Sequence, residues 1–433
     1  MRGDRDKGRA RKRVITMRRG SFFAFLGMLG VGSFAAAATP PAAAPPHAAA
    51  PGAPPISVKV TATNPLPTPR GRETITLTIT ALAKLIPRFD TKVDAKKVIV
   101  VDAAGKPVLS QLVDLDGDGA PDELIFQSDF AASQTKSFGV ALGTRRLAAP
   151  TDYKVYGRFV RERHDDFAWE NDQVAHRMYG PDLETFVKEP LTSSGIDTWS
   201  KRVPKLVVNE WYMTDDYHQD SGEGADFYSV GKSRGCGGLG LWVGGKLSTS
   251  RNFVTSRVLA NGPGRLIFEL TYAPWGAGGG LRVAETKRVT LDAGTSFNRF
   301  ESTFTGGKAP LAVGLGIAKH PGSVVRVDAS PTSMRVWEPL KGPHGEPGGN
   351  LGCAIVLPAG APMEPHHGDL DYLVVTPVPA DGNGSARLVY HVGSVWDQAG
   401  RIKDADAWAR AIADLAAQVG APLKVELAPV PPR

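Results

Sequence analysis

The sequence predicts a mainly β protein, in which a small N-terminal β-sandwich is followed by a large antiparallel β domain with few helices. Short segments of alternating apolar and polar residues recur along the chain, and 49 Gly and 34 Pro punctuate them. Only one stretch has the spacing of an amphipathic helix, so the helices that a doubly wound sheet requires between its strands are missing. With 433 residues, the chain has room for two or three domains.

The first segment, residues 1–38, has the order of an export signal. A basic stretch (Arg9–Arg19) precedes an apolar stretch (Phe22–Ala38) that ends in alanines, the small side chains that a signal peptidase requires. Arg18-Arg19 resembles the pair of a twin-arginine signal, and Met17 offers an alternative start. We expect a cleaved signal peptide, a periplasmic or extracellular mature protein and no stable membrane insertion. An uncleaved anchor is the alternative, although the apolar run is short for a membrane span.

The charge distribution argues against a nucleic-acid-binding protein. The chain carries 51 Lys/Arg and 44 Asp/Glu, but nine of the former and two of the latter lie in residues 1–38. The two signs are therefore balanced in the remainder of the chain. A nucleic-acid-binding surface needs an excess of positive charge on the folded part, and we expect no nucleic acid partner.

A linker and a small β-sandwich follow the leader. Residues 39–55 are almost entirely Pro and Ala, which cannot build a core, so we expect an extended linker. The small domain is predicted over residues 56–149, because strands separated by turns recur there. Its clearest strand covers residues 74–80, where Ile75, Leu77 and Ile79 alternate with threonines. Further strands are predicted at residues 97–102, 124–126 and 138–140.

The large domain is predicted over residues 150–433, and its segments continue to alternate like strands. The one helix is predicted from Asp404, which can cap its N-terminus, to Gly420, with an apolar stripe from Trp408 onward. Cys236 and Cys353 permit one disulfide, but we favour two buried free thiols. The predicted strands lie at residues 266–272, 283–291, 297–304, 372–378 and 387–392.

A loop of alternating aspartates in the small domain has the spacing of a calcium site. From residue 114, carboxylates stand at positions 1, 3, 5 and 9, and Gly119 stands at position 6, where the chain must turn sharply. Ile125 replaces the usual glutamate at position 12, so another group must complete the coordination. We expect one structural Ca²⁺, and a solvated turn between two strands is the alternative. The predicted ligands are Asp114, Asp116, Asp118 and Asp122.

A polar and aromatic block over residues 164–252 is the predicted functional site. Indole faces stack on the apolar face of a sugar ring, carboxylates accept hydrogen bonds from its hydroxyls, and Arg or Lys can bind a uronate. The catalytic candidates are His164, Glu170, Asp172, Tyr217, His218, Glu223 and Asp226. The substrate-binding candidates are Trp169, Arg177, Trp199, Lys201, Arg202 and Trp211.

Each of these residues also has a structural interpretation. The tryptophans can belong to the core, the histidines can be satisfied interior imidazoles, and the cations can be partners of structural ion pairs. What favours a site is the concentration of so many charges and aromatic rings in one block of a domain without net charge.

Four motifs resemble a bacterial family of unknown function, domain-of-unknown-function family 4861, over nearly all of the mature chain. They are His164 to Asp172, Arg177 to Pro181, His218 to Tyr228 and Ser233 to Gly238. The resemblance implies an exported protein whose genes often neighbour those for enzymes acting on pectin-like, uronate-containing polysaccharides. It also implies that the large domain is a galactose-mutarotase-like antiparallel β super-sandwich. The resemblance supplies no established catalytic residues.

The sequence therefore predicts an exported carbohydrate-active enzyme, a lyase or hydrolase, whose partner is a uronate-containing saccharide. For elimination, Arg177, Lys201 or Arg202 would neutralise the uronate, His218 or His164 would abstract a proton, and Tyr217 would be the acid. For hydrolysis, the carboxylate pair would be Glu223 with Asp226 or Glu170 with Asp172. The alternatives are a sugar epimerase, a non-catalytic carbohydrate-binding protein and a structural envelope protein.

Overall fold

The computed structural model describes residues 54–187, 190–214, 216–307, 310–381 and 383–431. The predicted signal peptide and nearly all of the predicted linker lie outside the described residues. None of the helices in the described part of the chain combines the length and the apolar character that crossing a lipid bilayer requires.

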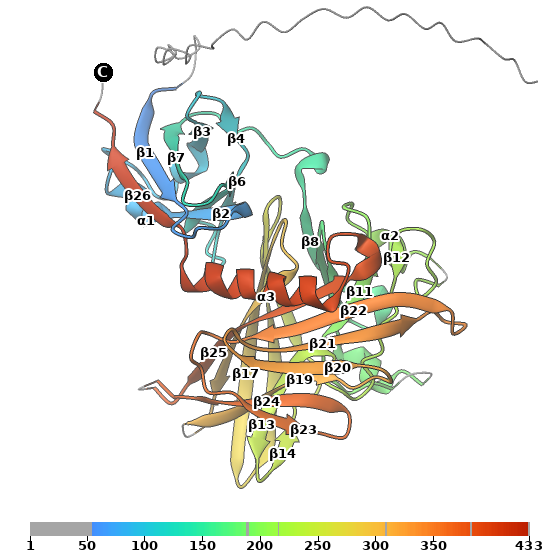
Figure 1. The fold of residues 1–433 in the computed structure, drawn as a ribbon. Helices are drawn as coiled ribbons and strands as arrows, with labels where there is room; N and C mark the ends of the chain where they lie inside the picture. Colours follow the sequence, from blue (N-terminus) through green and yellow to red (C-terminus); the bar gives the residue numbers. More distant parts are fainter. Residues whose placement is uncertain (1–53, 188–189, 215, 308–309, 382, 432–433) are drawn as a thin grey trace, which may run out of the picture. The chain divides into compact units, whose positions relative to one another are not determined.

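Two antiparallel sheets enclose the core of the small β-sandwich (Figure 1). Their facing residues are apolar, such as Val60 on one sheet and Phe126 on the other, and both are buried. The strands of the first sheet, in spatial order, are β26 (Lys424–Pro429), β1 (Ile56–Thr63), β7 (Thr135–Leu142), β3 (Val98–Asp102) and β4 (Pro107–Val108). Those of the second are β2 (Arg70–Thr78), β6 (Glu123–Phe130) and β5 (Ser110–Val113).

Two features of the small sandwich differ from the sequence-based expectations. The last strand, β26, pairs with β1 and places Leu427 opposite Val60, so the small sheet includes residues far beyond the expected range 56–149. The predicted strand at 74–80 ends early, because Thr78 caps the short helix α1 (Ile79–Ala83) by accepting a hydrogen bond from Ala81 N at 3.2 Å. A 3₁₀ turn, η1 (Ala95–Lys97), precedes β3.

Two larger antiparallel sheets form the predicted large sandwich. Apolar side chains from both sheets make one continuous core, in which Phe300 and Leu315 are fully buried. The eight-stranded sheet contains, in spatial order, β15 (Thr255–Asn261), β16 (Arg265–Gly278), β17 (Leu281–Asp292), β18 (Phe297–Thr305), β25 (Ala386–Trp396), β22 (Pro347–Val356), β21 (Thr332–Lys341) and β20 (Val324–Ala329). The five-stranded sheet contains β14 (Lys246–Ser248), β13 (Cys236–Val243), β19 (Leu311–Ala318), β24 (Asp371–Val378) and β23 (Glu364–His367).

A further five-stranded antiparallel sheet carries most of the predicted functional block. Its strands, in spatial order, are β12 (Gly224–Ala225), β11 (Asp197–Lys201), β10 (Ala175–Met178), β9 (Asp166–Asn171) and β8 (Val155–Val160). Every residue of β9, β10 and β11 is buried. The polar residues of these strands are therefore inside the protein, and each needs a partner there. The helical elements beside this sheet are η2 (Pro150–Asp152), η3 (Arg161–Arg163), η4 (Pro181–Thr185) and α2 (Val208–Tyr212).

Among the described residues there is one long helix, and it is the one that the sequence predicts. After η5 (Asp397–Ala399), helix α3 (Ala405–Gly420) begins where Asp404 Oδ1 accepts a hydrogen bond from Ala407 N at 2.7 Å. Trp408 and Ile412 are buried against the eight-stranded sheet, as an apolar stripe requires.

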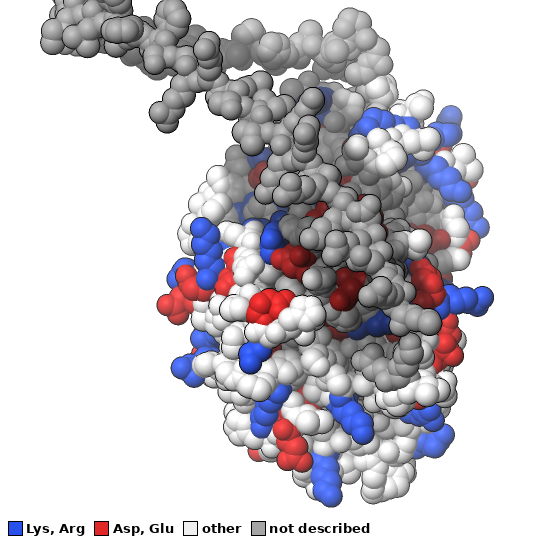
Figure 2. Space-filling model, turned by 90° about the vertical axis from the view of Figure 1, so that its right-hand side faces the viewer, with Lys and Arg blue, Asp and Glu red and all other residues white. Residues whose placement is uncertain are grey.

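Charge and cysteine state also agree with the sequence analysis. Cys236 and Cys353 are both buried free thiols. On the face seen in Figure 2, acidic and basic side chains alternate with uncharged ones, and neither sign forms a continuous patch.

Candidate functional site

The centre of the candidate site is an arginine surrounded by three aspartates. Arg177 lies on β10, between Asp166 on β9 and Asp197 on β11. Its Nε donates to Asp197 Oδ2 at 2.8 Å, its Nη1 donates to Tyr217 Oη at 3.0 Å, and its Nη2 donates to Asp226 Oδ2 at 3.3 Å. Asp166 Oδ2 lies 3.7 Å from Arg177 Nη1. The antiparallel pairing of the short strands thus places Asp166 and Asp197, which are 31 positions apart in the sequence, on the two strands that flank Arg177.

Burial is the largest cause of the pKa shifts of these carboxyl groups. Burial raises the pKa of Asp226 well above its ordinary value; the neighbouring Asp197 raises it further, and Arg177 opposes the shift. Burial also raises the pKa of Asp166 to about 7. Asp226 Oδ1 and Asp166 Oδ2 are buried, and neither has a hydrogen-bond partner among the described residues. The raised pKa favours the protonated form of Asp226, which can act as an acid by donating its proton.

His218 lies beside Asp226 and is set up as a base. Its Nδ1 lies 2.9 Å from the backbone carbonyl oxygen of Asp226. Because a carbonyl oxygen only accepts, Nδ1 carries the hydrogen and donates it, which leaves the lone pair on Nε2. The His218 side chain is 46 % exposed, and its ring lies 4.4 Å from that of Tyr217, centroid to centroid. An imidazole in this tautomer can take a proton from a ligand through Nε2.

A cavity of about 430 Å³ brings the acid and the base together. Its size is within the range of ligand pockets. Asp226 and His218 both line it, and so do Arg177 and the exposed carboxylate Asp216. Lys341, at the end of β21, also lines this cavity. It is exposed, and no carboxylate of the described residues lies within 4.0 Å of its ammonium group.

Arg177 is not placed as the sequence analysis expected of a substrate-binding cation. Its donors are committed to Asp197, Asp226 and Tyr217, and its side chain is only 9 % exposed. The groups around Arg177 already occupy the donors of its guanidinium group. The cation that can meet a substrate carboxylate in this cavity is Lys341, which the sequence analysis did not select.

Glu170 and Lys201 form a buried ion pair and do not reach the cavity, which corrects their predicted catalytic and substrate-binding roles. Lys201 Nζ donates to Glu170 Oε2 at 2.7 Å, and both side chains are fully buried. Glu170 also accepts hydrogen bonds from Val207 N and Val208 N at the start of α2. Burial raises the pKa of Glu170, and Lys201 opposes that shift. The pair holds α2 against the sheet.

The three predicted tryptophan platforms lie in the interior, so none can stack on a sugar ring. Trp169 is fully buried, and its Nε1 donates to Asn298 Oδ1 at 2.8 Å. Trp199 and Trp211 stack on each other with ring centroids 5.5 Å apart in a separate apolar cluster. Large aromatic side chains bury the most apolar area, and these three serve the core.

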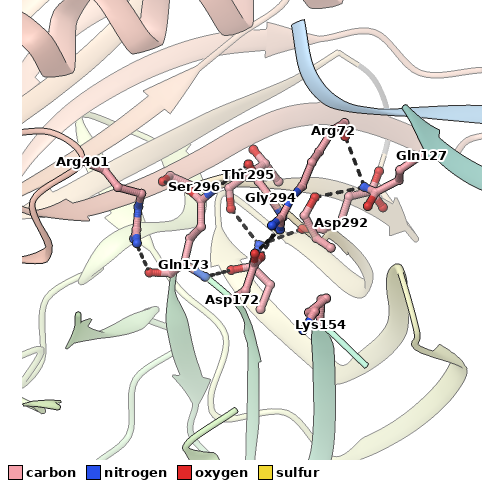
Figure 3. A network of polar contacts seen from close by, with 12 residues as sticks. Arg72, Gln127, Lys154, Asp172, Gln173, Asp292, Gly294, Thr295, Ser296 and Arg401 are labelled. Carbon is pink, nitrogen blue, oxygen red and sulfur yellow. Dashed lines mark hydrogen bonds and ion pairs between the residues drawn. The ribbon is translucent and has the colours of Figure 1, made fainter. Parts of the chain in front are cut away.

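Asp172 and Arg202 also lie away from the cavity. Asp172 forms an ion pair with Arg72 at the start of β2, and its Oδ1 accepts a hydrogen bond from Gly294 N at 2.8 Å (Figure 3). Arg202 donates to Asp220 Oδ2 at 2.5 Å and lies over the ring of Trp396. Asp172 therefore has a structural partner instead of a catalytic one, and Arg202 is held at another surface.

Tyr217, His164 and Glu223 are the remaining candidates, and none of them is among the residues that line the cavity; Tyr217 instead contacts Arg177. His164 stacks on Phe186 with ring centroids 3.8 Å apart, in a left-handed backbone turn with φ of 52°. Glu223 pairs with Lys205 at 2.7 Å, and Trp211 Nε1 lies 3.4 Å from its carboxylate. Neither residue lines the cavity, so the predicted pair of Glu223 with Asp226 is not assembled there.

The structure brings His218, Tyr217 and Asp226, which were selected from the sequence, close together. The sequence-based selection did not include Asp166, Asp197 and Lys341. The two aspartates carried a signal, since both lie in the polar block. Lys341 carried none, because it lies more than 100 residues away in the sequence.

The acidic loop of the small domain gathers three of the four predicted calcium ligands. One carboxylate oxygen from each of Asp114, Asp116 and Asp122 lies within 4.8 Å of the others. Asp118 does not join them, and its Oδ1 accepts a hydrogen bond from Ala120 N at 2.7 Å. Three oxygens fit a hard cation, which requires six to eight in total, so backbone carbonyls or water would complete the shell. Calcium binding stays a prediction.

Comparisons with known proteins relate the chain to one family and to several solved structures. "Uncharacterized protein P7" of Formosa agariphila is 32% identical over 385 residues, which cover 85% of this chain and 93% of that protein. A glycosyl hydrolase family 38 protein of Enterococcus faecalis is 10% identical with a TM-score of 0.41; the match covers 86% of this chain and 47% of that one, so the chain spans about half its length. A mutant of the heparan sulfate lyase HepC of Pedobacter heparinus matches with a TM-score of 0.26 over 59% of this chain and 38% of that one. A family model matches residues 62–425, which confirms the resemblance of the four motifs: the chain belongs to the family described as Domain of unknown function (DUF4861).

Proposed function

We propose that this protein is an exported carbohydrate-active enzyme that cleaves uronate-containing oligosaccharides by β-elimination in the cavity beside His218. The observation that carries the proposal is the meeting of a base and an acid in one cavity. The Nδ1–H of His218 is fixed by the Asp226 carbonyl, which frees Nε2, and burial raises the pKa of the Asp226 carboxyl group, which favours its protonated form. Elimination, hydrolysis, epimerisation and binding without catalysis differ in the roles that they assign to His218 and Asp226.

Elimination needs three functions, and the cavity offers a group for each. Lys341 would pair with the uronate carboxylate, which acidifies the proton on the adjacent C5 carbon. His218 Nε2 would take that proton, the electron pair would form the C4–C5 double bond, and the C4–O bond to the leaving sugar would break. Asp226 would give its proton to the leaving oxygen. Each proton and electron pair is then accounted for without a cofactor in the step.

Hydrolysis is the second candidate function, because Asp216 is exposed and lines the same cavity as Asp226. Asp226 as the acid and the Asp216 side chain as the base would match the carboxyl pair of a glycosidase. A sugar epimerase would use only the proton transfer of His218. A non-catalytic carbohydrate-binding protein would use the cavity without any of these steps.

The experiment that tests the proposal is incubation of the mature protein with oligogalacturonides and other uronate oligosaccharides. Elimination produces an unsaturated uronate that absorbs in the ultraviolet, whereas hydrolysis produces reducing ends without that absorbance. Epimerisation changes the sugar without cleavage. Saccharide binding without turnover would favour the binding protein, and absence of both would favour a structural envelope protein.

Variants of the cavity make the test specific. His218→Gln should lower kcat by about 10²- to 10⁴-fold, the usual contribution of a general base, with little change in binding. Lys341→Gln should weaken binding of an oligogalacturonide about tenfold and leave binding of its uncharged methyl ester unchanged. Lys246→Gln, an exposed lysine of β14, is the matched control and should change neither. If His218→Gln retains full turnover, the assignment of the base is wrong.

A further inference from the structure

A second cavity lies apart from the first, and none of the residues considered for the proposed reaction lines it. Its volume is about 520 Å³. It lies between the start of β2 (71–74), the β17–β18 turn and the start of β18 (292–299), and helix α3. Figure 3 shows its polar side, where Asp172, Gln173 and Gly294 join the network that includes Arg72 and Arg401.

One wall of this cavity is apolar. Leu415 and Val419 of α3 line it, one helical turn apart, and they continue the stripe whose first members, Trp408 and Ile412, are buried. Val419 remains 46 % exposed. The apolar stripe of α3 therefore extends from the core into the cavity, where it offers an apolar surface to a ligand.

The lining of the cavity also includes positive charge that carboxylates of the described residues do not fully neutralise. Arg299 Nη2 donates to Glu301 Oε2 at 3.0 Å, but Arg387 Nε also donates to Glu301, at 2.7 Å, so two guanidinium groups share one carboxylate. Arg401 Nη2 donates to the backbone carbonyl of Gln173 at 2.8 Å, and it has no carboxylate of the described residues within 4.0 Å. Spare guanidinium donors suit a carboxylate ligand.

A histidine with no partner lies next to this charge. His391 is opposite Arg299 in the pairing of β18 with β25, and both line the cavity. Within the described part of the chain, the His391 ring makes no hydrogen bond that meets a distance of 3.5 Å. Burial lowers the pKa of His391 to about 4, and Arg299 adds to the shift. The other charged groups that line the cavity are Arg72, Glu73, Arg265, Asp292 and Asp414.

Most of these other charges already have partners. Arg265 donates to both oxygens of Asp292, at 2.6 and 2.7 Å, and Arg72 pairs with Asp172. Asp414 is exposed on α3, close in sequence to Leu415, and can accept hydrogen bonds from hydroxyl groups. A ligand that combines an anionic group with an apolar face would therefore complement both the positive charge and the apolar wall of this cavity.

We propose that this cavity binds a small organic carboxylate, with its carboxylate between Arg299 and His391 and its body against Leu415 and Val419. Such a ligand can be a sugar acid or an apolar acid. Asp414 and Gln418 on the same helix face favour the sugar acid, since they can bind its hydroxyl groups. The site does not depend on the proposed reaction, because it shares no residue with the cavity at His218.

The test is calorimetric titration of the mature protein with three probes: D-galacturonate, benzoate and D-galactose. We expect one of the two carboxylates to bind saturably and neutral galactose to bind much more weakly. Saturation by galacturonate alone identifies a sugar-acid site, and saturation by benzoate identifies a site for apolar acids. Between pH 4 and 6.5, bound carboxylate should favour protonated His391, so the binding heat should depend on the ionisation enthalpy of the buffer.

Variants separate this site from nonspecific binding. Arg299→Gln should weaken carboxylate binding roughly 10- to 150-fold, and His391→Gln should abolish the buffer dependence. Val419→Glu changes an exposed position, so the protein should still fold, and the added negative charge should weaken binding at least tenfold. Lys403→Gln, an exposed neighbour outside the cavity, is the control and should bind like the wild type. The proposal is overturned if neither carboxylate saturates, if galactose binds equally well, or if Arg299→Gln and Val419→Glu both bind normally.

Discussion

The buried pair of Glu170 and Lys201 allows a sharp test of whether this part of the polar block supports the fold or the chemistry. We consider Lys201→Met, which keeps the length of the side chain and removes its ammonium group. In the wild type both side chains are fully buried, and Lys201 Nζ lies 2.7 Å from Glu170 Oε2 and 2.6 Å from the carbonyl oxygen of Asn171. The change leaves the Glu170 carboxylate with only the hydrogen bonds from Val207 N and Val208 N.

The expected loss is large because one charge of a buried pair is left without its partner. Breaking such a pair costs about 3–5 kcal/mol, so the free energy of unfolding of Lys201→Met should fall by about that amount. Burial already raises the pKa of Glu170, and removal of Lys201 removes an opposing effect. The native state of the variant then keeps a proton on Glu170 that the unfolded state releases. Its stability should therefore fall as pH rises above the ordinary carboxyl pKa, and the loss should be smaller in acid than near neutrality.

The assay is urea unfolding at two pH values, together with saccharide binding by the folded variant. Lys205→Met is the matched control, since Lys205 is 44% exposed in its pairs with Glu210 and Glu223, and such surface pairs contribute about 0–1 kcal/mol. A second variant, Glu170→Leu combined with Lys201→Met, should recover much of the lost stability, because it removes both charges. The interpretation is wrong if Lys201→Met unfolds like the wild type and yet loses saccharide binding, since Lys201 would then face the ligand.

Three further predictions concern the carboxyl cluster, the acidic loop and the leader. Burial raises the pKa of Asp166 from 3.8 to about 7, so the stability contributed by its protonated carboxyl group is complete below the ordinary pKa and is lost as pH rises through about 7. Asp166→Asn should remove about 3 kcal/mol of pH dependence between pH 5 and pH 8, measured by urea unfolding at these two pH values. A chelator should lower the melting temperature of the wild type, and Asp116→Ala should erase the difference between calcium and chelator, since ligand binding to the native state alone stabilises by mass action, about 2.7 kcal/mol at a hundredfold excess over Kd. An unchanged wild-type melting temperature would show that the loop is only a turn. N-terminal sequencing of exported protein should find a start near Thr39, and membrane-bound material that retains Met17 would contradict cleavage.

Local sequence patterns were sufficient to predict the class of fold and the long helix α3. The alternation of Ile75 and Leu77 with threonines predicts a strand, and β2 contains it. The cap at Asp404 and the stripe from Trp408 predict α3 with its observed start. These predictions succeed because period-two and helical patterns are set by which face of one element is buried, and neighbouring residues alone encode that. The same reasoning fails at Ile79, where a capping hydrogen bond to Thr78 starts a helix against the strand pattern.

The candidate site shows what local patterns leave undecided. A polar block in the sequence is compatible with a cavity and with a buried ion pair, and the structure contains both: His218 lines a cavity, whereas Glu170 is sealed in the interior with Lys201. The sequence shows where a carboxyl group stands in the chain, but the pKa of that group depends on its burial and its neighbours in the folded protein, as Asp226 illustrates.

The sequence by itself determined the mainly β fold, the balance of charge beyond residue 38, and the polar block that contains His218 and Asp226. Only the tertiary structure decided which members of that block are accessible, and it added Lys341 from a distant strand end. The tertiary structure also pairs β26, the last strand of the chain's described part, with β1 of the small sandwich. The physical reason is the same in each case: strand pairing joins residues that are remote in the chain, and the free energy of burying a polar group depends on the partners that it finds there.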